Sequence, residues 1–132
     1  MKKNTDVGFL LLRITVAGLM LFHGVAKLSN LNGIKNMLSQ AGLPEVMAYG
    51  VYITELIAPV LILIGFRTRL ASVAFFFGMI TAMFLAHSEK MFALSKTGSL
   101  EIELILLFAF GALVLFFTGA GKYAVSTPNQ WD

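Results

Sequence analysis

The side chains of this sequence that could do chemistry lie inside its most apolar stretches. Arg13, His23 and Lys27 fall within one apolar run of membrane length, and Glu55 falls near the middle of the next run. A charged side chain at bilayer depth costs about 3 kcal/mol or more, and it normally points toward a partner, a cavity or an interface. These four residues are therefore the first candidates for a functional site.

Their chemistry suits proton exchange with a small bound molecule. An imidazole and a carboxyl group can both pass protons, so we predict His23 and Glu55 as catalytic residues. Lys27 can stabilise an anionic oxygen, and Tyr52 can donate a hydrogen bond. A polar pocket of this kind would suit a quinone or another small amphipathic molecule. The predicted ligand-binding residues are Arg13, Lys27, Tyr52, His87 and Glu103.

Helical geometry determines which of these side chains can meet. At about 100° per residue, His23 and Lys27 share one face of a helix, with Arg13 at its edge. Tyr52 lies three residues before Glu55 and is expected on the same face. Because successive spans alternate in direction, we expect one polar pocket in the outer half of the membrane. Its predicted members are His23, Lys27, Tyr52, Glu55, His87 and Glu103.

A second interpretation gives the same residues a purely structural role. They could form ion pairs that fix the register of the helices, a use for which buried pairs are known. The candidate pairs are Arg13 or His23 with Glu55, and Lys27 with Glu103. Arg13, which belongs to the cytoplasmic half of its span, is expected to pair toward Glu55.

Haem and metal sites have less support. The sequence contains no cysteine, which excludes thiolate metal sites, iron–sulfur clusters and covalently attached haem. A bis-histidine haem needs both imidazoles at one depth, but the helix rise places His87 about 5 Å further out than His23. No Glu-x-x-His motif is present, and a single metal held by His87 and Glu103 would require a coincidence of geometry. We predict no metal site.

The composition is that of an integral membrane protein. Of the 132 residues, 58% are hydrophobic and only 13% are charged, and the mean hydropathy is +0.82. Soluble domains have about half apolar and a quarter charged residues. The first apolar run is too long for a signal peptide and lacks a cleavage site, so we expect it to be retained. The net charge of +3 is small and dispersed, which gives nucleic-acid binding little support.

The apolar segments predict an all-α, four-helix transmembrane bundle that forms a single domain over residues 1–132. Each segment is about long enough to cross a hydrocarbon core of ~30 Å. Gly65 is expected to end the second helix, and Arg67 and Arg69 mark the membrane surface in the turn that follows. The predicted spans cover residues 7–28, 46–64, 70–87 and 100–118.

The connection over residues 29–44 has a helical pattern of its own. Ser29 or Asn30 can cap its start, and Pro44 lies at its end. We predict a short interfacial helix that covers the mouth of the bundle; an ordinary amphipathic surface loop is the alternative. The apolar positions of this connection are Ile34, Met37, Leu38 and Ala41.

In the third span small residues recur at every fourth position, which predicts a close packing seam. The seam consists of Ala74, Gly78, Ala82 and Ala86.

The charges that flank the spans predict both termini in the cytoplasm of a bacterial cell, with the chain crossing the inner membrane several times. Lysine and arginine are enriched in cytoplasmic loops. With this orientation the inner side carries Lys2, Lys3, Arg67, Arg69 and Lys122, and the outer side carries Lys27, Lys35, Lys90 and Lys96.

In the order of these features the chain resembles the DoxX family of small four-helix membrane proteins. The resemblance is carried by HGVAKL in the first span, ELIAPVLILIGFRTR in the second, His87, Glu103, and the ending GAGKYAVS. Two positions depart from the family pattern, because Ala120 replaces a usual proline and Ser126 stands where aspartate is common. The positions that match the family are Arg13, His23, Lys27, Glu55 and Glu103.

The resemblance implies a quinol-oxidising or thiosulfate:quinone oxidoreductase subunit, or a membrane partner of a soluble redox or detoxifying enzyme. We therefore predict a membrane subunit or accessory of a quinone-linked oxidoreductase, with quinone as its ligand. The alternative is a non-catalytic scaffold that recruits such an enzyme. A third possibility is a small-solute permeability protein. Four spans are too few for such a protein as a monomer, so the chain would have to form a homo-oligomer. The sequence leaves open whether the chain is itself an enzyme.

Overall fold

The computed structural model describes residues 2–87, 102–125 and 130–132, and within these ranges it is helical with no strand. The first span is one continuous helix with a π-helical turn, η1, in its middle. The second span contains a 3-10 turn, η2, and a π-helical segment, η3. The elements are α1 Thr5–Arg13, η1 Ile14–Gly18, α2 Leu19–Leu28, α3 Leu31–Gln40, η2 Glu45–Tyr49, η3 Tyr52–Ile57, α4 Ala58–Ile64, α5 Thr68–His87 and α6 Glu103–Thr118.

Three of the described helices are long and apolar enough to cross a membrane. They are Thr5–Leu28 with 24 residues, Glu45–Ile64 with 20 and Thr68–Leu85 with 18. The fourth helix, α6, is apolar but has 16 described residues. The prediction of an all-helical membrane protein is confirmed, and the first three spans begin within two residues of their predicted starts. The predicted start of the fourth span, residue 100, lies outside the described residues.

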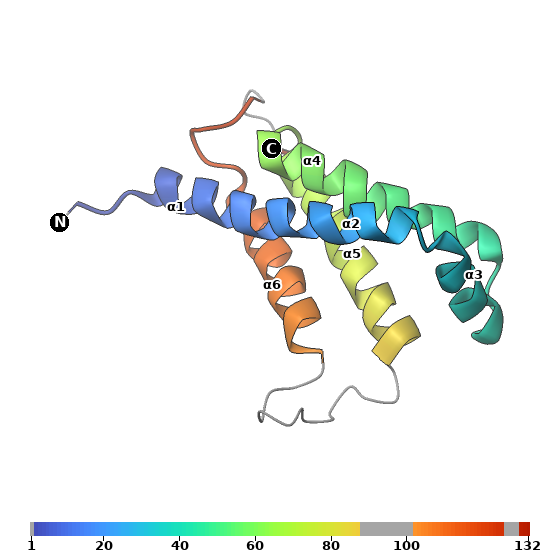
Figure 1. Cartoon of the computed structure of the whole chain (residues 1–132). Helices are drawn as coiled ribbons and strands as arrows, with labels where there is room; N and C mark the ends of the chain where they lie inside the picture. The colour runs from blue at the N-terminus through green and yellow to red at the C-terminus, as the bar shows by residue number, and fades with distance from the viewer. Residues whose placement is uncertain (1, 88–101, 126–129) are drawn as a thin grey trace.

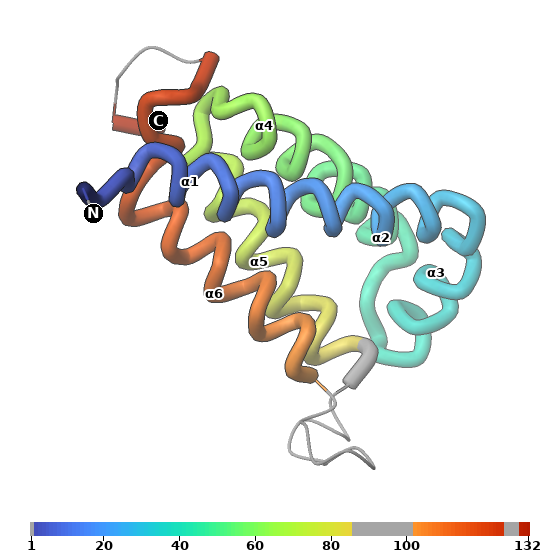
Figure 2. Tube along the Cα trace, turned by 60° about the vertical axis from the view of Figure 1, so that its left-hand side comes forward, coloured from blue at the N-terminus to red at the C-terminus, as the bar shows by residue number. Residues whose placement is uncertain are grey.

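The helices form two pairs that cross each other (Figures 1 and 2). The first and second spans lie side by side in one pair, and α5 and α6 lie side by side in the other. Residues from all four contribute to one core, because each helix turns a strip of apolar side chains inward. The core contains Val16, Ala17, Met20, Ala58, Ile62, Ala71, Phe75, Met79, Phe108, Ala109, Ala112 and Leu115.

The segment between the first two spans contains the predicted short helix, α3 (Figure 1). Ile34 and Leu38 are buried and pack with Ala48 from η2, whereas Met37 and Ala41, which were also predicted on the apolar face, are exposed, so the predicted face docks only in part. Asn30 occupies the N-cap position, although its side chain makes no capping hydrogen bond. After the helix the chain turns at Gly42, whose φ angle is +76°.

Gly65 ends the second span as predicted. Its φ angle is +78°, a left-handed conformation that glycine adopts without strain. The site is also crowded, since a Cβ atom there would lie 2.8 Å from Nη2 of Arg13 and 2.9 Å from Cα of Ala124. The turn therefore requires glycine both for its backbone angle and for the close approach of Ala124 and of the Arg13 side chain.

The small-residue strip of the third span contacts the second span at Gly78. A Cβ atom at Gly78 would lie 2.8 Å from Cγ2 of Thr54, so the absence of a side chain allows the two helices to approach closely. Ala74 packs against the core, and the side chain of Ala86 lies outside the described residues. The predicted packing seam is thus confirmed at its centre.

Candidate ligand-binding site

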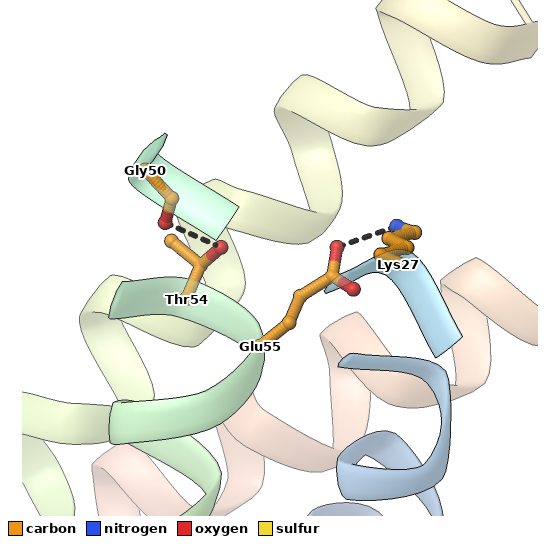
Figure 3. A network of polar contacts seen from close by, with 4 residues as sticks. All are labelled: Lys27, Gly50, Thr54 and Glu55. Carbon is orange, nitrogen blue, oxygen red and sulfur yellow. Dashed lines mark hydrogen bonds and ion pairs between the residues drawn. The ribbon is translucent and has the colours of Figure 1, made fainter. Parts of the chain in front are cut away.

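The first and second spans are joined by a buried ion pair. Lys27 Nζ lies 2.6 Å from Oε1 of Glu55 (Figure 3). The carboxylate side chain is 3% exposed and the lysine side chain is 39% exposed. Both residues were predicted for the site, but their pairing was not: Glu55 was expected to bind Arg13 or His23, and Lys27 was expected to bind Glu103. The structure corrects these pairs.

A glycine one turn earlier explains why Lys27 reaches this partner. Gly24 is buried, and a Cβ atom there would collide with the backbone carbonyl of Glu55 and lie 2.9 Å from Cδ2 of Leu56. The two backbones therefore touch at Gly24, and the side chain of Lys27 projects across the contact. Sequence reasoning missed this role of Gly24, although its position within one turn of Lys27 was a usable signal.

Glu55 itself lies within a π-helical segment, η3. π-Helical turns inside α-helices are rare and often occur at functional sites. In the turn before Glu55, the Thr54 hydroxyl donates a hydrogen bond to the carbonyl oxygen of Gly50 at 3.2 Å (Figure 3). The wider turn changes which side chains share a face, because each residue advances less around the axis than in an α-helix.

Tyr52 shows the consequence of that change. It was expected beside Glu55 on one face, but its ring stacks on Tyr49 with centroids 6.0 Å apart. Tyr52 is not among the residues that line the cavity described below. The prediction assumed α-helical spacing, and the π-helical segment does not follow it.

Glu55 and Lys27 line a cavity of about 400 Å³, which we call the larger cavity. Its walls come from the first span, α3, the second span, α5 and α6. The volume lies within the range of about 300–1,000 Å³ typical of small-molecule sites, which are mostly apolar with a few polar groups. Its polar side chains are Lys27, Thr54, Glu55 and Thr81; the other lining residues are apolar or glycine.

His23 lines a second cavity of about 290 Å³, which we call the smaller cavity. The two cavities share the side chains of Lys27, Ala82 and Ile105. The His23 ring packs edge-on against Phe108, with centroids 5.9 Å apart. His23 and Lys27 are therefore on one face of the helix, as predicted, but His23 is not placed against the Glu55 carboxylate.

Arg13 has a different environment. Its guanidinium group is 1% exposed and donates hydrogen bonds to four backbone carbonyl oxygens. Two belong to Ile62 and Leu63, at 2.9 and 2.8 Å, where α4 is ending. The others belong to Ala120 and Tyr123, at 3.1 and 2.6 Å. The last carbonyl groups of a helix lack partners within it, so a cation satisfies them well.

The expectation that Arg13 belongs to the ligand pocket or pairs with Glu55 therefore does not hold in the structure. Its donors are used at the end of α4, whereas Glu55 precedes α4 in the same span. Arg13 does not line either cavity. It fastens the C-terminal segment to the first and second spans.

The two remaining predicted residues lie apart from the ion pair or outside the description. Glu103 is exposed at the start of α6 and borders a shallow hollow with Leu106, Leu107 and Phe110. That hollow lies on a different face of α6 from Ile105, which lines the larger cavity. The side chain of His87 lies outside the described residues. Within the described ranges, no group of three His, Asp or Glu side chains could hold a metal.

Comparison with known proteins shows the family of this chain. The DoxX family model matches residues 8–88. This chain belongs to the DoxX family. The matched segment contains both members of the Lys27–Glu55 pair, together with all cavity-lining residues except those from α6.

Two curated relatives match most of the chain. The "Putative oxidoreductase CatD" of Bacillus subtilis strain 168 is 32% identical over 107 residues, which are 81% of this chain and 77% of that protein. The "Inner membrane protein YqjF" of Escherichia coli strain K12 is 35% identical over 128 residues, which are 95% of this chain and 94% of that protein. No solved structure matches the chain significantly.

Proposed function

We propose that this DoxX protein is the membrane component of a quinone-linked oxidoreductase and that it binds a quinone, or another small amphipathic molecule, in the larger cavity. The observation that carries the proposal is the Lys27–Glu55 ion pair in the wall of an otherwise largely apolar cavity of about 400 Å³. Membership in a family with an oxidoreductase-named relative supports the same class.

The ion pair favours a binding role over a purely structural one. Replacing a buried pair with apolar residues of similar volume is often neutral or stabilising, so such a pair is weak evidence of a contribution to stability. Lys27 remains 39% exposed at its side chain, and the carboxylate does not saturate its three N–H donors. The ammonium group can therefore donate to an oxygen of a bound molecule without leaving Glu55.

The proposed chemistry divides between this chain and a partner. The chain supplies the binding cavity, the ammonium donor of Lys27 and the proton-exchanging carboxylate of Glu55. His23, in the adjoining smaller cavity, is the proposed second proton carrier, on the other side of Lys27. The sequence has no cysteine that could hold a thiolate-bound redox centre. In this proposal a partner oxidoreductase exchanges electrons with the bound quinone.

Ligand binding by the purified protein tests the proposal. We expect quinone in the lipid extract of gently purified protein, and an increase in thermal stability when a short-chain quinone is added. Lys27→Met should weaken binding of the quinone about tenfold, since it removes a charge-assisted donor to a ligand oxygen, and Glu55→Gln should weaken binding of the reduced quinol about tenfold, since it removes a charge-assisted acceptor for a ligand hydroxyl. Glu45→Gln, at an exposed position outside the cavity, is the matched control.

The scaffold alternative gives a different result in the same preparation. If quinone neither co-purifies with the protein nor stabilises it, and a soluble enzyme co-purifies equally with wild type and the Glu55→Gln variant, the chain is a recruiting scaffold.

The proposed location is the inner membrane, with both termini cytoplasmic, following the charge distribution and the name of the Escherichia coli relative. Reporter fusions that are active only in the periplasm should be inactive at either terminus.

A further inference from the structure

The Glu55 carboxylate has one oxygen that no described protein group satisfies. Oε1 accepts from Lys27 Nζ, whereas Oε2 is buried and accepts no hydrogen bond within the described residues (Figure 3). Glu55 is 2% exposed and lines the larger cavity. Leaving a buried acceptor without a donor is costly, and such atoms in folded proteins call for an explanation. A ligand that donates a hydrogen bond would remove this cost.

The charge of the site restricts that ligand to a neutral molecule. Lys27 already balances the charge of Glu55 at 2.6 Å. A cationic ligand would meet the ammonium group, and an anionic ligand would meet the carboxylate, in surroundings where like charges repel strongly. An aliphatic amine would be protonated near neutral pH, whereas a phenolic hydroxyl stays neutral, since its pKa is about 10. A hydroxyl group on an apolar ring is therefore the best match.

We infer that the larger cavity binds a neutral, hydroxyl-bearing ligand, and that within the quinone class it binds the reduced quinol more tightly than the oxidised quinone. This inference rests on the function proposed above. A quinol carries two O–H donors, whereas both oxygens of a quinone are acceptors only. Only the quinol can supply the donor that Oε2 of Glu55 lacks.

The geometry allows the donor and Lys27 to bind the carboxylate together. Rotation about the last side-chain bond of a glutamate is soft, and it exchanges the two oxygens. Either oxygen can therefore turn toward the cavity while Lys27 holds the other. The apolar walls, which include Phe77 and Leu85 of α5, accommodate the ring. A preference of about tenfold for the reduced form would raise the two-electron potential of the bound couple by about 30 mV.

Three probes with one ring test the inference on the wild-type protein in anaerobic detergent solution. They are tetramethylhydroquinone, tetramethylbenzoquinone and the dimethyl ether of the hydroquinone, which keeps the shape but has no donor. We expect calorimetry to give a Kd for the hydroquinone about tenfold or more below that of the quinone and of the ether, since a buried acceptor gains its missing hydrogen bond. Equal or tighter binding of the quinone or the ether overturns the inference and leaves the proposed function standing. Binding of none of the three overturns both.

A variant locates the preference at Glu55. In Glu55→Gln the amide offers both a donor and an acceptor, so the preference should fall to about threefold or less. Glu45→Gln, which is exposed and does not line the cavity, should keep the full preference. An undiminished preference in a folded Glu55→Gln protein would overturn the assignment to this carboxylate. The three-probe comparison on wild type decides the ligand class even if that variant does not fold.

Discussion

The first span carries two buried or half-buried cations with opposite surroundings. Arg13 is 1% exposed and donates hydrogen bonds to four backbone carbonyl oxygens. The side chain of Lys27 is 39% exposed, binds a single carboxylate oxygen and borders two cavities. Among the described residues Arg13 has four hydrogen-bond acceptors, whereas Lys27 has one acceptor and borders two cavities. The comparison shows how two charges in one helix can serve stability at one end and ligand binding at the other.

Removing the charge of Arg13, whose donors are bound to four carbonyl groups, should have the largest effect on stability. In Arg13→Met four carbonyl groups lose a donor, and each buried unsatisfied group costs about 1–3 kcal/mol, so we expect a loss of about 3 kcal/mol or more. The measurement is the thermal unfolding of the protein in detergent. Arg13→Lys keeps the charge but offers fewer donors in a different geometry, and should recover only part of the stability. A stable Arg13→Met protein that has lost quinone binding would reverse the comparison.

Separating the two spans at Gly24 should have the next largest effect, and it should fall on binding. In Gly24→Ala the added methyl group collides with the Glu55 carbonyl, so the helices must move apart and Lys27 loses its geometry. We expect binding of a short-chain quinone to weaken about tenfold, although alanine favours a helix by up to about 1 kcal/mol over glycine.

Gly8→Ala is the matched control for that variant. A Cβ atom at Gly8 would meet nothing within 4 Å, so this substitution should keep ligand affinity and leave the unfolding temperature equal or slightly higher. If both alanine variants bind equally well, close contact at Gly24 does not position the ion pair.

Removing the charge of Lys27 should lower stability less than removing that of Arg13. In Lys27→Met the methionine can fill the same space, and one acceptor, Oε1 of Glu55, loses its donor where four carbonyl groups do so in Arg13→Met, so we expect a loss of about 1–3 kcal/mol, smaller than that of Arg13→Met. Unfolding in detergent, measured beside Arg13→Met, gives the contrast directly. A loss as large as that of Arg13→Met would make Lys27 a structural residue as well.

Local features of the fold could be predicted from the sequence because they depend on nearby residues. The apolar runs gave the first three spans to within two residues at their starts, and the spacing of Ile34 and Leu38 gave the buried face of α3. Gly65 was predicted as a helix end and has the left-handed backbone angle that such ends use. Each of these features rests on chain periodicity or on the preference of a single residue.

The partners of the buried charges could not be predicted in the same way. By helical position alone, several cations could pair with the Glu55 carboxylate. The sequence pattern does not indicate which of them does. Tyr52 was placed beside Glu55 by α-helical spacing, which η3 does not follow. Arg13 was assigned to a carboxylate because the free carbonyl groups at the end of α4 have no signature in the side-chain sequence.

The sequence by itself determined that the chain is a helical membrane protein with charged side chains buried in its spans, because hydrophobic length and charge are properties of the residues. Only the tertiary structure decided that Lys27, and not Arg13, pairs with Glu55. That choice depends on the close backbone contact at Gly24 and on the C-terminal segment that occupies Arg13. Both are contacts between distant parts of the chain, and they exist only once the helices have packed.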